Sequence, residues 1–128
     1  MKLLLDTQII FWWTLADPKL PLGAKTLIAN ADEVFVIAVS NWELDIKVST
    51  GKLNLDLADF AQQVSQDGFQ VLKMEPRHAN RVSLLPLFDD HKDPFDRMLI
   101  AQSLEEPLIF VTTDRKLARY APTVTVLA

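Results

Sequence analysis

Residues 34–51 read VFVIAVSNWELDIKVSTG, in which an apolar, β-branched run passes directly into a more polar segment that ends at a glycine. Residues 34–38 predict a short buried strand. Residues 40–49 predict a helix, and Gly51 marks its end. A strand followed at once by a helix is typical of an α/β fold.

The same alternation continues toward both ends of the chain. Further strands are predicted at residues 3–6, 69–72, 108–112 and 124–127, and further helices at residues 7–15, 22–31, 56–66, 75–84 and 94–105. Most of the strands are unbroken apolar runs, which indicates a parallel sheet covered on both faces. We therefore predict one α/β domain over residues 1–128.

Composition excludes several kinds of site. The 128 residues include no cysteine, which excludes disulfide frameworks and thiol chemistry. The two histidines, His78 and His91, are far apart in sequence and are predicted to lie at the surface, which argues against a histidine-rich zinc site. Asp6 interrupts the apolar start, and no run approaches the ~20 apolar residues of a membrane span. We expect a cytoplasmic protein with no membrane segment.

The net charge of −4 does not by itself exclude a nucleic-acid partner. Phosphate contacts usually need a basic surface, whereas 17 acidic residues here oppose 13 lysines and arginines. If four acids bind a metal ion, 13 acids remain against 13 basic residues, and the rest of the surface is neutral. Local basic patches can then still form.

Four acidic residues lie where strands give way to helices. Asp6 ends the first predicted strand, and Glu43 lies in the first turn of the helix after the second. Asp96 lies in the first turn of a later helix, and Asp114 lies two residues after the end of the predicted strand at 108–112. In an open parallel sheet, strand C-termini and the following helix N-termini share one edge, where α/β proteins place their sites. We expect the four carboxylates to converge there.

A cluster of carboxylates of this kind predicts a bound cation. Like charges a few ångströms apart raise each other's pKa values, and a hard divalent cation with oxygen ligands removes that cost. Such ions activate a water and stabilise the leaving oxygen in phosphodiester cleavage. The four acids therefore predict a site for a hard divalent cation, of the kind that can support phosphodiester cleavage.

Each acid also has a structural interpretation, which stays open. Ser40 and Glu43 have the spacing of a capping box. Asp93 is an N-cap candidate before Pro94 and is placed to pair with Arg97. The remaining acids are candidates to cap a helix or to favour its dipole: Asp6, Asp96 and Asp114.

Other side chains flank the acids in sequence. The basic residues that we regard as candidate contacts to a phosphate backbone are Lys47, Lys52, Lys92, Arg97 and Arg115. Three hydroxyls are candidates to orient metal-bound waters or phosphates, although such hydroxyls often make local backbone bonds instead: Thr7, Ser40 and Thr112.

Four stretches resemble the PIN-domain family and, within it, the VapC-type toxins of bacterial toxin–antitoxin pairs. They are LLLDTQIIFWW at 3–13, SNWELDIKVSTGKL at 40–53, HKDPFDRMLIAQSL at 91–104 and LIFVTTD at 108–114. The resemblance implies a three-layer α/β/α fold around a mostly parallel sheet of four to five strands. It also implies hydrolysis of RNA, a homodimer, and a cognate antitoxin whose C-terminal segment covers the active site.

The resemblance extends to individual acids. It implies Mg²⁺ or Mn²⁺ binding by Asp6, Glu43, Asp96 and Asp114, with Asp93 as a supporting ligand. Gln8 stands where close relatives often carry histidine, so its role is open. Our hypothesis is a metal-dependent endoribonuclease. The alternatives are a non-catalytic PIN-like module that acts through a partner protein, and a protein phosphorylated on Asp6, which lacks the neighbouring acid that such sites usually have.

Overall fold

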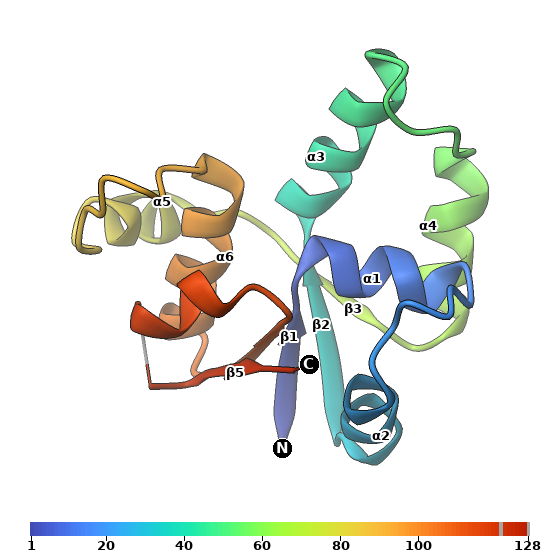
Figure 1. Cartoon of the computed structure of the whole chain (residues 1–128), viewed down its shortest axis with the longest axis horizontal. Coiled ribbons are helices and arrows are strands. Elements are labelled where there is room, and N and C mark those ends of the chain that lie inside the picture. Colours follow the sequence, from blue (N-terminus) through green and yellow to red (C-terminus); the bar gives the residue numbers. More distant parts are fainter. Residues whose placement is uncertain (121, 128) are drawn as a thin grey trace.

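A five-stranded parallel sheet forms the centre of the computed structural model, which describes residues 1–120 and 122–127 (Figure 1). The strand order is β3-β2-β1-β4-β5. The strands are β1 (Lys2–Leu5), β2 (Glu33–Ile37), β3 (Gln70–Leu72), β4 (Ile109–Thr112) and β5 (Val124–Val126). All four neighbouring pairs are parallel. The prediction of a parallel α/β sheet is confirmed.

Helices cover both faces of this sheet. They are α1 (Thr7–Thr14), α2 (Leu22–Asn30), α3 (Ala38–Ser49), α4 (Leu57–Gln66), α5 (Pro76–Val82) and α6 (Pro94–Glu105), with a 3₁₀ helix η1 (Arg115–Arg119) after β4. In Figure 1, α5 and α6 lie on one side of β1, and α1 to α4 lie on the other. The result is a three-layer α/β/α arrangement. In the described part of the chain, no helix is both long enough and apolar enough to cross a membrane.

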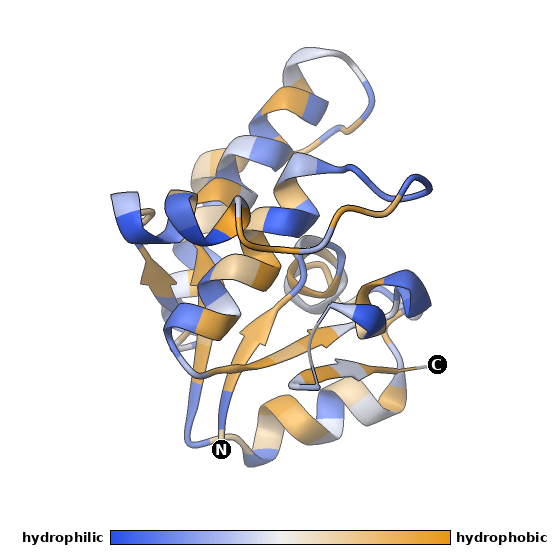
Figure 2. Ribbon diagram, turned by 90° about the vertical axis from the view of Figure 1, so that its left-hand side faces the viewer, coloured by the Kyte–Doolittle hydropathy of each residue, from blue (hydrophilic) through white to orange (hydrophobic). Residues whose placement is uncertain are grey.

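Alternation along the central strand explains why two cores form. Leu3 and Leu5 join the core under α1 to α4, whereas Leu4 points to the opposite core with Leu99 and Phe110. All five of these side chains are fully buried. Because both faces are covered, the strands are hydrophobic along most of their length (Figure 2).

Side-chain caps and glycines mark the ends of several helices, among them the predicted Asp93 cap and the predicted Gly51 end. The Asp56 and Asp93 carboxylates accept backbone N–H bonds at the N-termini of α4 and α6. Gly51 and Gly68 follow α3 and α4 with φ of 76° and 81°, a conformation that costs glycine little.

The start of α3 differs from the prediction. The helix begins at Ala38, directly after β2, and its N-cap position is Ile37. Ser40 therefore lies inside the helix, and the predicted capping box with Glu43 does not form. Glu43 consequently lies in the second turn rather than the first. The hydroxyl of Ser40 accepts a 2.8 Å hydrogen bond from Thr7 instead.

The sheet topology places a site between β1 and β4. The chain moves from β1 outward to β2 and β3, and then crosses to the other side of β1 to form β4 and β5. In doubly wound sheets, the crevice outside the carboxyl ends of the strands at such a reversal is where ligands bind. Asp6 follows β1 here, and its backbone N–H donates to the carbonyl of Val111 in β4 at 2.9 Å.

Candidate metal centre

A pocket of about 270 Å³ lies at the reversal point between β1 and β4. It is lined by five carboxylates: Asp6, Glu43, Asp93, Asp96 and Asp114. The remaining lining residues are Thr7, Gln8, Phe11, Leu44, Lys47, Leu53 and Thr113. The fold therefore brings together the four acids that the sequence placed at one edge, and it adds Asp93.

Asp6 is the most deeply buried of these acids, with 9% of its surface exposed. Burial, with smaller contributions from the nearby Asp96 and Glu43 carboxylates, raises the pKa of Asp6 to about 7, against the lowering effect of a hydrogen bond from Thr112. The Thr112 hydroxyl donates that bond to Asp6 Oδ2 at 2.6 Å. The side chain of Asp6 does not cap α1. A buried carboxylate with a raised pKa beside other acids is the situation that a divalent cation relieves.

Thr112 also connects Asp6 to Asp114. Its Oγ1 accepts a 3.0 Å hydrogen bond from the backbone N–H of Asp114 while it donates to Asp6. The Asp114 carboxylate in turn accepts from the backbone N–H of Lys116 at 3.0 Å, as the N-cap of η1. The structural interpretation of Asp114 as a cap is thus confirmed, and the residue still lines the pocket.

Glu43 reaches the pocket from α3. Burial raises its pKa, with added effect from Asp93 and Asp96, while the Thr7 hydroxyl and then Lys47 oppose the rise. The Lys47 ammonium lies 3.8 Å from a Glu43 carboxylate oxygen, one turn along the same helix. Lys47 is therefore a cation that lines the pocket and faces the acids directly.

Asp96 reaches the pocket from the first turn of α6. Burial raises its pKa as well, and a hydrogen bond from His91 opposes that rise. The two side chains meet at 3.1 Å between Nε2 and Oδ2. A ligand atom of His91, one of Asp96 and one of Asp114 all lie within 4.8 Å of one another. Our expectation of a surface position for His91 is wrong, because its side chain is only 7% exposed.

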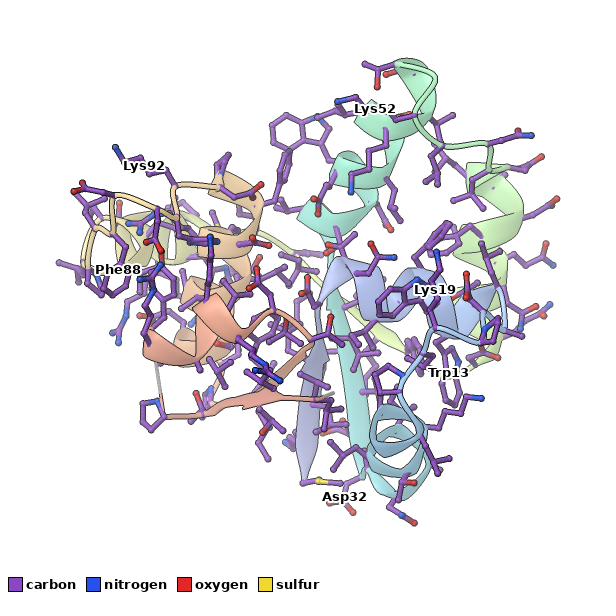
Figure 3. The ribbon with its side chains drawn as sticks, in the orientation of Figure 1. Trp13, Lys19, Asp32, Lys52, Phe88 and Lys92 are labelled. Atoms are coloured by element: carbon purple, nitrogen blue, oxygen red, sulfur yellow. The ribbon has the colours of Figure 1, made fainter. Side chains whose placement is uncertain are left out.

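Apart from Lys47, the candidate phosphate contacts are either exposed or buried. Lys52, Lys92 and Arg115 are exposed. Figure 3 shows Lys52 near the far end of α3 and Lys92 at the periphery beside α6, so these two lysines stand on different sides of the molecule. Arg97 is different: it is 7% exposed, and its guanidinium donates to the backbone carbonyls of Pro86 and Val82 at 2.8 and 3.1 Å.

The interior position of Arg97 corrects two expectations. A guanidinium that is bonded to these backbone carbonyls is not free to contact a phosphate, and it does not make the predicted pair with Asp93. The Asp93 carboxylate instead accepts from the backbone N–H groups of Phe95 and Asp96, at 2.8 and 3.0 Å, as an N-cap.

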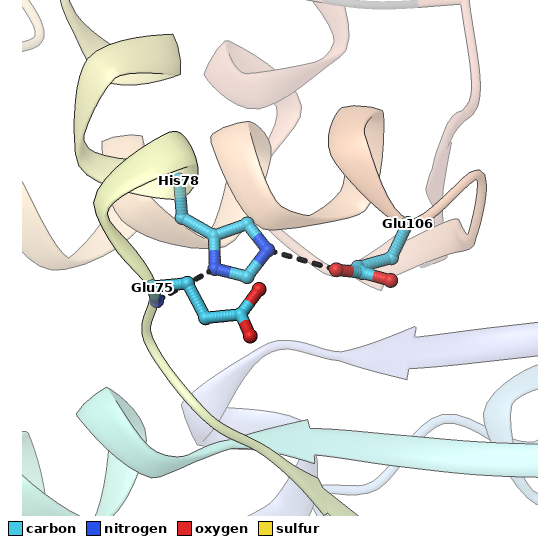
Figure 4. A group of neighbouring side chains, drawn as sticks. All are labelled: Glu75, His78 and Glu106. Carbon is cyan, nitrogen blue, oxygen red and sulfur yellow. Dashed lines mark hydrogen bonds and ion pairs between the residues drawn. The ribbon is translucent and has the colours of Figure 1, made fainter.

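His78 is also buried rather than exposed, at 1%. Its Nδ1 accepts from the backbone N–H of Glu75 at 3.0 Å, and its Nε2 lies 2.9 Å from a Glu106 carboxylate oxygen (Figure 4). Arg77 forms ion pairs with both glutamates. This cluster therefore has its own cation and ties α5 to the end of α6, away from the acidic pocket.

Sequence reasoning missed His91 and Tyr120, which support the pocket from behind. Tyr120 is 8% exposed, and its hydroxyl lies 2.7 Å from His91 Nδ1. The local sequence places His91 five residues before Asp96. This spacing matches neither helix nor strand periodicity, so it did not predict contact between the two side chains.

Comparison with known proteins agrees with this architecture. The PIN domain family model matches residues 3–122. The chain is 30% identical over 116 residues to ribonuclease VapC22 of Mycobacterium tuberculosis, covering 89% of this chain and 88% of that protein.

Two solved structures share the fold. One is VapBC2 from Rickettsia felis bound to a DNA fragment from their promoter, with a TM-score of 0.69, 15% identity, and coverage of 98% of this chain and 97% of that chain. The other is a toxin–antitoxin complex from Klebsiella pneumoniae, with a TM-score of 0.65, 17% identity, and coverage of 96% and 95%. With its parallel sheet, its acidic pocket at the strand ends and these matches, the chain belongs to the PIN-domain family and resembles that family's VapC-type members.

Proposed function

We propose that this protein is a divalent-metal-dependent endoribonuclease and the toxin of a toxin–antitoxin pair. The observation that carries the proposal is the gathering of five carboxylates from four separate segments around one pocket at the reversal point of the sheet. RNA is the proposed substrate because the similar mycobacterial protein is named a ribonuclease.

The donor set fits a hard cation. The pocket offers carboxylate oxygens, and the pKa values of Asp6, Glu43 and Asp96 are raised by burial and by neighbouring acids. Oxygen-only ligation suits Mg²⁺ or Mn²⁺. The residues proposed to hold the metal are Asp6, Glu43, Asp96 and Asp114, with Asp93 in support. The bound ion would supply an activated water and charge neutralisation at the phosphodiester.

The remaining pocket residues have distinct proposed roles. Thr112 orients Asp6 and holds the backbone of Asp114. Thr7 and Ser40 bond to each other at 2.8 Å, which joins the start of α1 to α3 behind Glu43. Lys47, inside the pocket, is the first candidate to meet a substrate phosphate. The exposed Lys52, Lys92 and Arg115 are candidates for the backbone on either side.

The proposal includes two protein partners. A cognate antitoxin is inferred from the resemblance to proteins solved in toxin–antitoxin complexes. A homodimer is inferred from the family resemblance. An apolar groove next to the acidic pocket is the surface that we propose for the dimer contact. Trp42 is 60% exposed in this groove. The residues that line it are Ala38, Val39, Trp42, Met74, Pro94, Phe95 and Met98.

The decisive experiment measures RNA cleavage by purified protein with Mg²⁺ or Mn²⁺ and with EDTA. We expect cleavage to need the metal and to fall by at least about 100-fold in Asp96→Asn, since losing a group that holds the ion costs several kcal/mol of transition-state stabilisation. Asp45→Asn is the matched control, because Asp45 is exposed on α3 and lies outside the pocket. Undiminished cleavage by a folded Asp96→Asn protein would contradict the proposal.

A further inference from the structure

The histidine behind Asp96 belongs to a chain of hydrogen bonds that starts deep in the protein. Arg97 Nη1 lies 3.5 Å from the Tyr120 hydroxyl, the hydroxyl lies 2.7 Å from His91 Nδ1, and His91 Nε2 lies 3.1 Å from Asp96 Oδ2. His91 and Tyr120 are both almost fully buried. The chain therefore runs through the interior and ends at a carboxylate of the pocket.

The chemistry of the groups determines the direction of this chain. An ionised carboxylate only accepts hydrogen bonds, so His91 must carry its proton on Nε2. The Nδ1 of a neutral imidazole is then an acceptor, and the Tyr120 hydroxyl must donate to it. Arg97 only donates, so its contact leaves the Tyr120 hydroxyl proton free for an acceptor. The hydroxyl lies 2.7 Å from His91 Nδ1 and 3.3 Å from the His91 backbone carbonyl, and the shorter contact assigns the proton to Nδ1. The contacts between these side chains thus have their donors directed toward Asp96.

The surrounding contacts hold each member in place. Arg97 is anchored on the carbonyls of Pro86 and Val82. The Tyr120 ring packs edge-on against Phe88, with centroids 5.0 Å apart. These contacts restrict each side chain to a single orientation toward its partner. In metal sites, hydrogen bonds from surrounding residues to the ligands commonly orient those ligands.

We propose that His91 is a positioning residue that fixes the Asp96 carboxylate for metal binding, and that Tyr120 and Arg97 fix the tautomer of His91. The inference rests on the proposed metal-dependent function. The Nε2–H bond engages Oδ2 of Asp96 and leaves Oδ1 for the cation. His91 itself is not a metal ligand, because its Nε2 carries the proton that orients Asp96.

The test compares Mn²⁺ affinity, measured by calorimetry on the intact chain, among variants of two buried histidines. His91→Leu removes the donor, and we expect Mn²⁺ to bind about 10–100-fold more weakly. His91→Gln keeps an N–H donor at nearly the same reach and should recover most of that loss. Tyr120→Phe should weaken Mn²⁺ binding in the same direction by a smaller factor.

His78→Leu is the matched control. His78 is as buried as His91 and makes the same kind of histidine–carboxylate contact, with Glu106, but outside the pocket. A purely structural effect of losing a buried histidine should appear in both variants as reduced stability. Only His91→Leu should also change the Mn²⁺ affinity.

A measurement on the unmodified protein covers the case in which His91→Leu does not fold. Nitrogen NMR of the histidine rings should show His91 protonated on Nε2, and still so with a diamagnetic ion such as Mg²⁺ bound. Protonation on Nδ1, or loss of the Nε2 proton on metal binding, would overturn the inference and make His91 a direct ligand. Equal Mn²⁺ affinity of a folded His91→Leu protein and wild type would overturn it too.

The outcomes separate this inference from the proposed function. If wild type binds Mn²⁺, Asp96→Asn does not, and His91→Leu binds as wild type does, the positioning role fails and the metal centre stands. If wild type neither binds Mn²⁺ nor cleaves RNA, the proposed function fails, and the inference fails with it.

Discussion

Replacing Asp6 with asparagine should stabilise the metal-free protein while removing its metal binding. Asp6 is 9% exposed, and burial raises its pKa from an ordinary 3.8 to about 7. Ionising this carboxylate in the folded protein is therefore costly when no cation is present. Asparagine keeps the shape and the acceptor oxygen for Thr112 but carries no charge.

The magnitude follows from the linkage between protonation and folding. The folded state keeps the Asp6 proton to a higher pH than the unfolded state, so the stabilisation is complete below about pH 4 and is lost as pH rises to about 7. A rise from 3.8 to about 7, at about 1.4 kcal/mol for each pKa unit, corresponds to about 4 kcal/mol. Asp6→Asn should therefore gain about 2–4 kcal/mol over wild type at about pH 8 and almost nothing at about pH 4.

Urea unfolding in EDTA across this pH range measures the free energy of unfolding directly. Repeating it with excess Mn²⁺ should stabilise wild type and leave Asp6→Asn nearly unchanged, because only the ionised carboxylate holds the ion. Asp45→Asn, on an exposed position of α3, serves as the control for loss of one surface charge. The reasoning is refuted if Asp6→Asn is less stable than wild type at about pH 8 in EDTA, or if the difference between them does not change with pH.

Three further predictions concern residues around the pocket and the end of α1. Thr112→Val removes the hydroxyl shared by Asp6 and Asp114, so the free energy of unfolding should fall by about 1–3 kcal/mol. The loss of stability that accompanies ionisation of Asp6 should also extend to higher pH in this variant. A neutral effect at every pH would contradict the bridging role. Arg97→Met leaves the carbonyls of Pro86 and Val82 without their donor and should cost about 2–3 kcal/mol in the same assay; a variant of unchanged stability that binds RNA less well would restore the phosphate-contact role. Ala16 has a φ of 51°, in the left-handed region, where glycine is less strained than alanine. Ala16→Gly should therefore stabilise the protein by about 0.5–1 kcal/mol, seen as a higher melting temperature. A lower melting temperature would show that the strain is relieved by other contacts.

Sequence patterns were sufficient wherever the signal is local. The apolar runs predicted all five strands. The signal is clearest in the central strands β1, β2 and β4, because a strand that is mostly buried on both faces has no polar side to interrupt it. Asp93 was recognised as an N-cap candidate because a cap bonds to backbone groups only two or three residues away. The start of α3 was missed because β2 passes into it with no side-chain cap at all.

The sequence by itself determined the α/β class and the edge of the sheet at which the acids would meet, since strand direction in a parallel sheet assigns every strand end to the same side. Only the tertiary structure decided what stands behind those acids. His91 and Arg97 looked like surface residues because their partners lie far along the chain: Tyr120 is 29 positions from His91, and Val82 is 15 from Arg97. Burial of a polar side chain depends on whether distant segments supply its hydrogen-bond partners, and no local pattern records that.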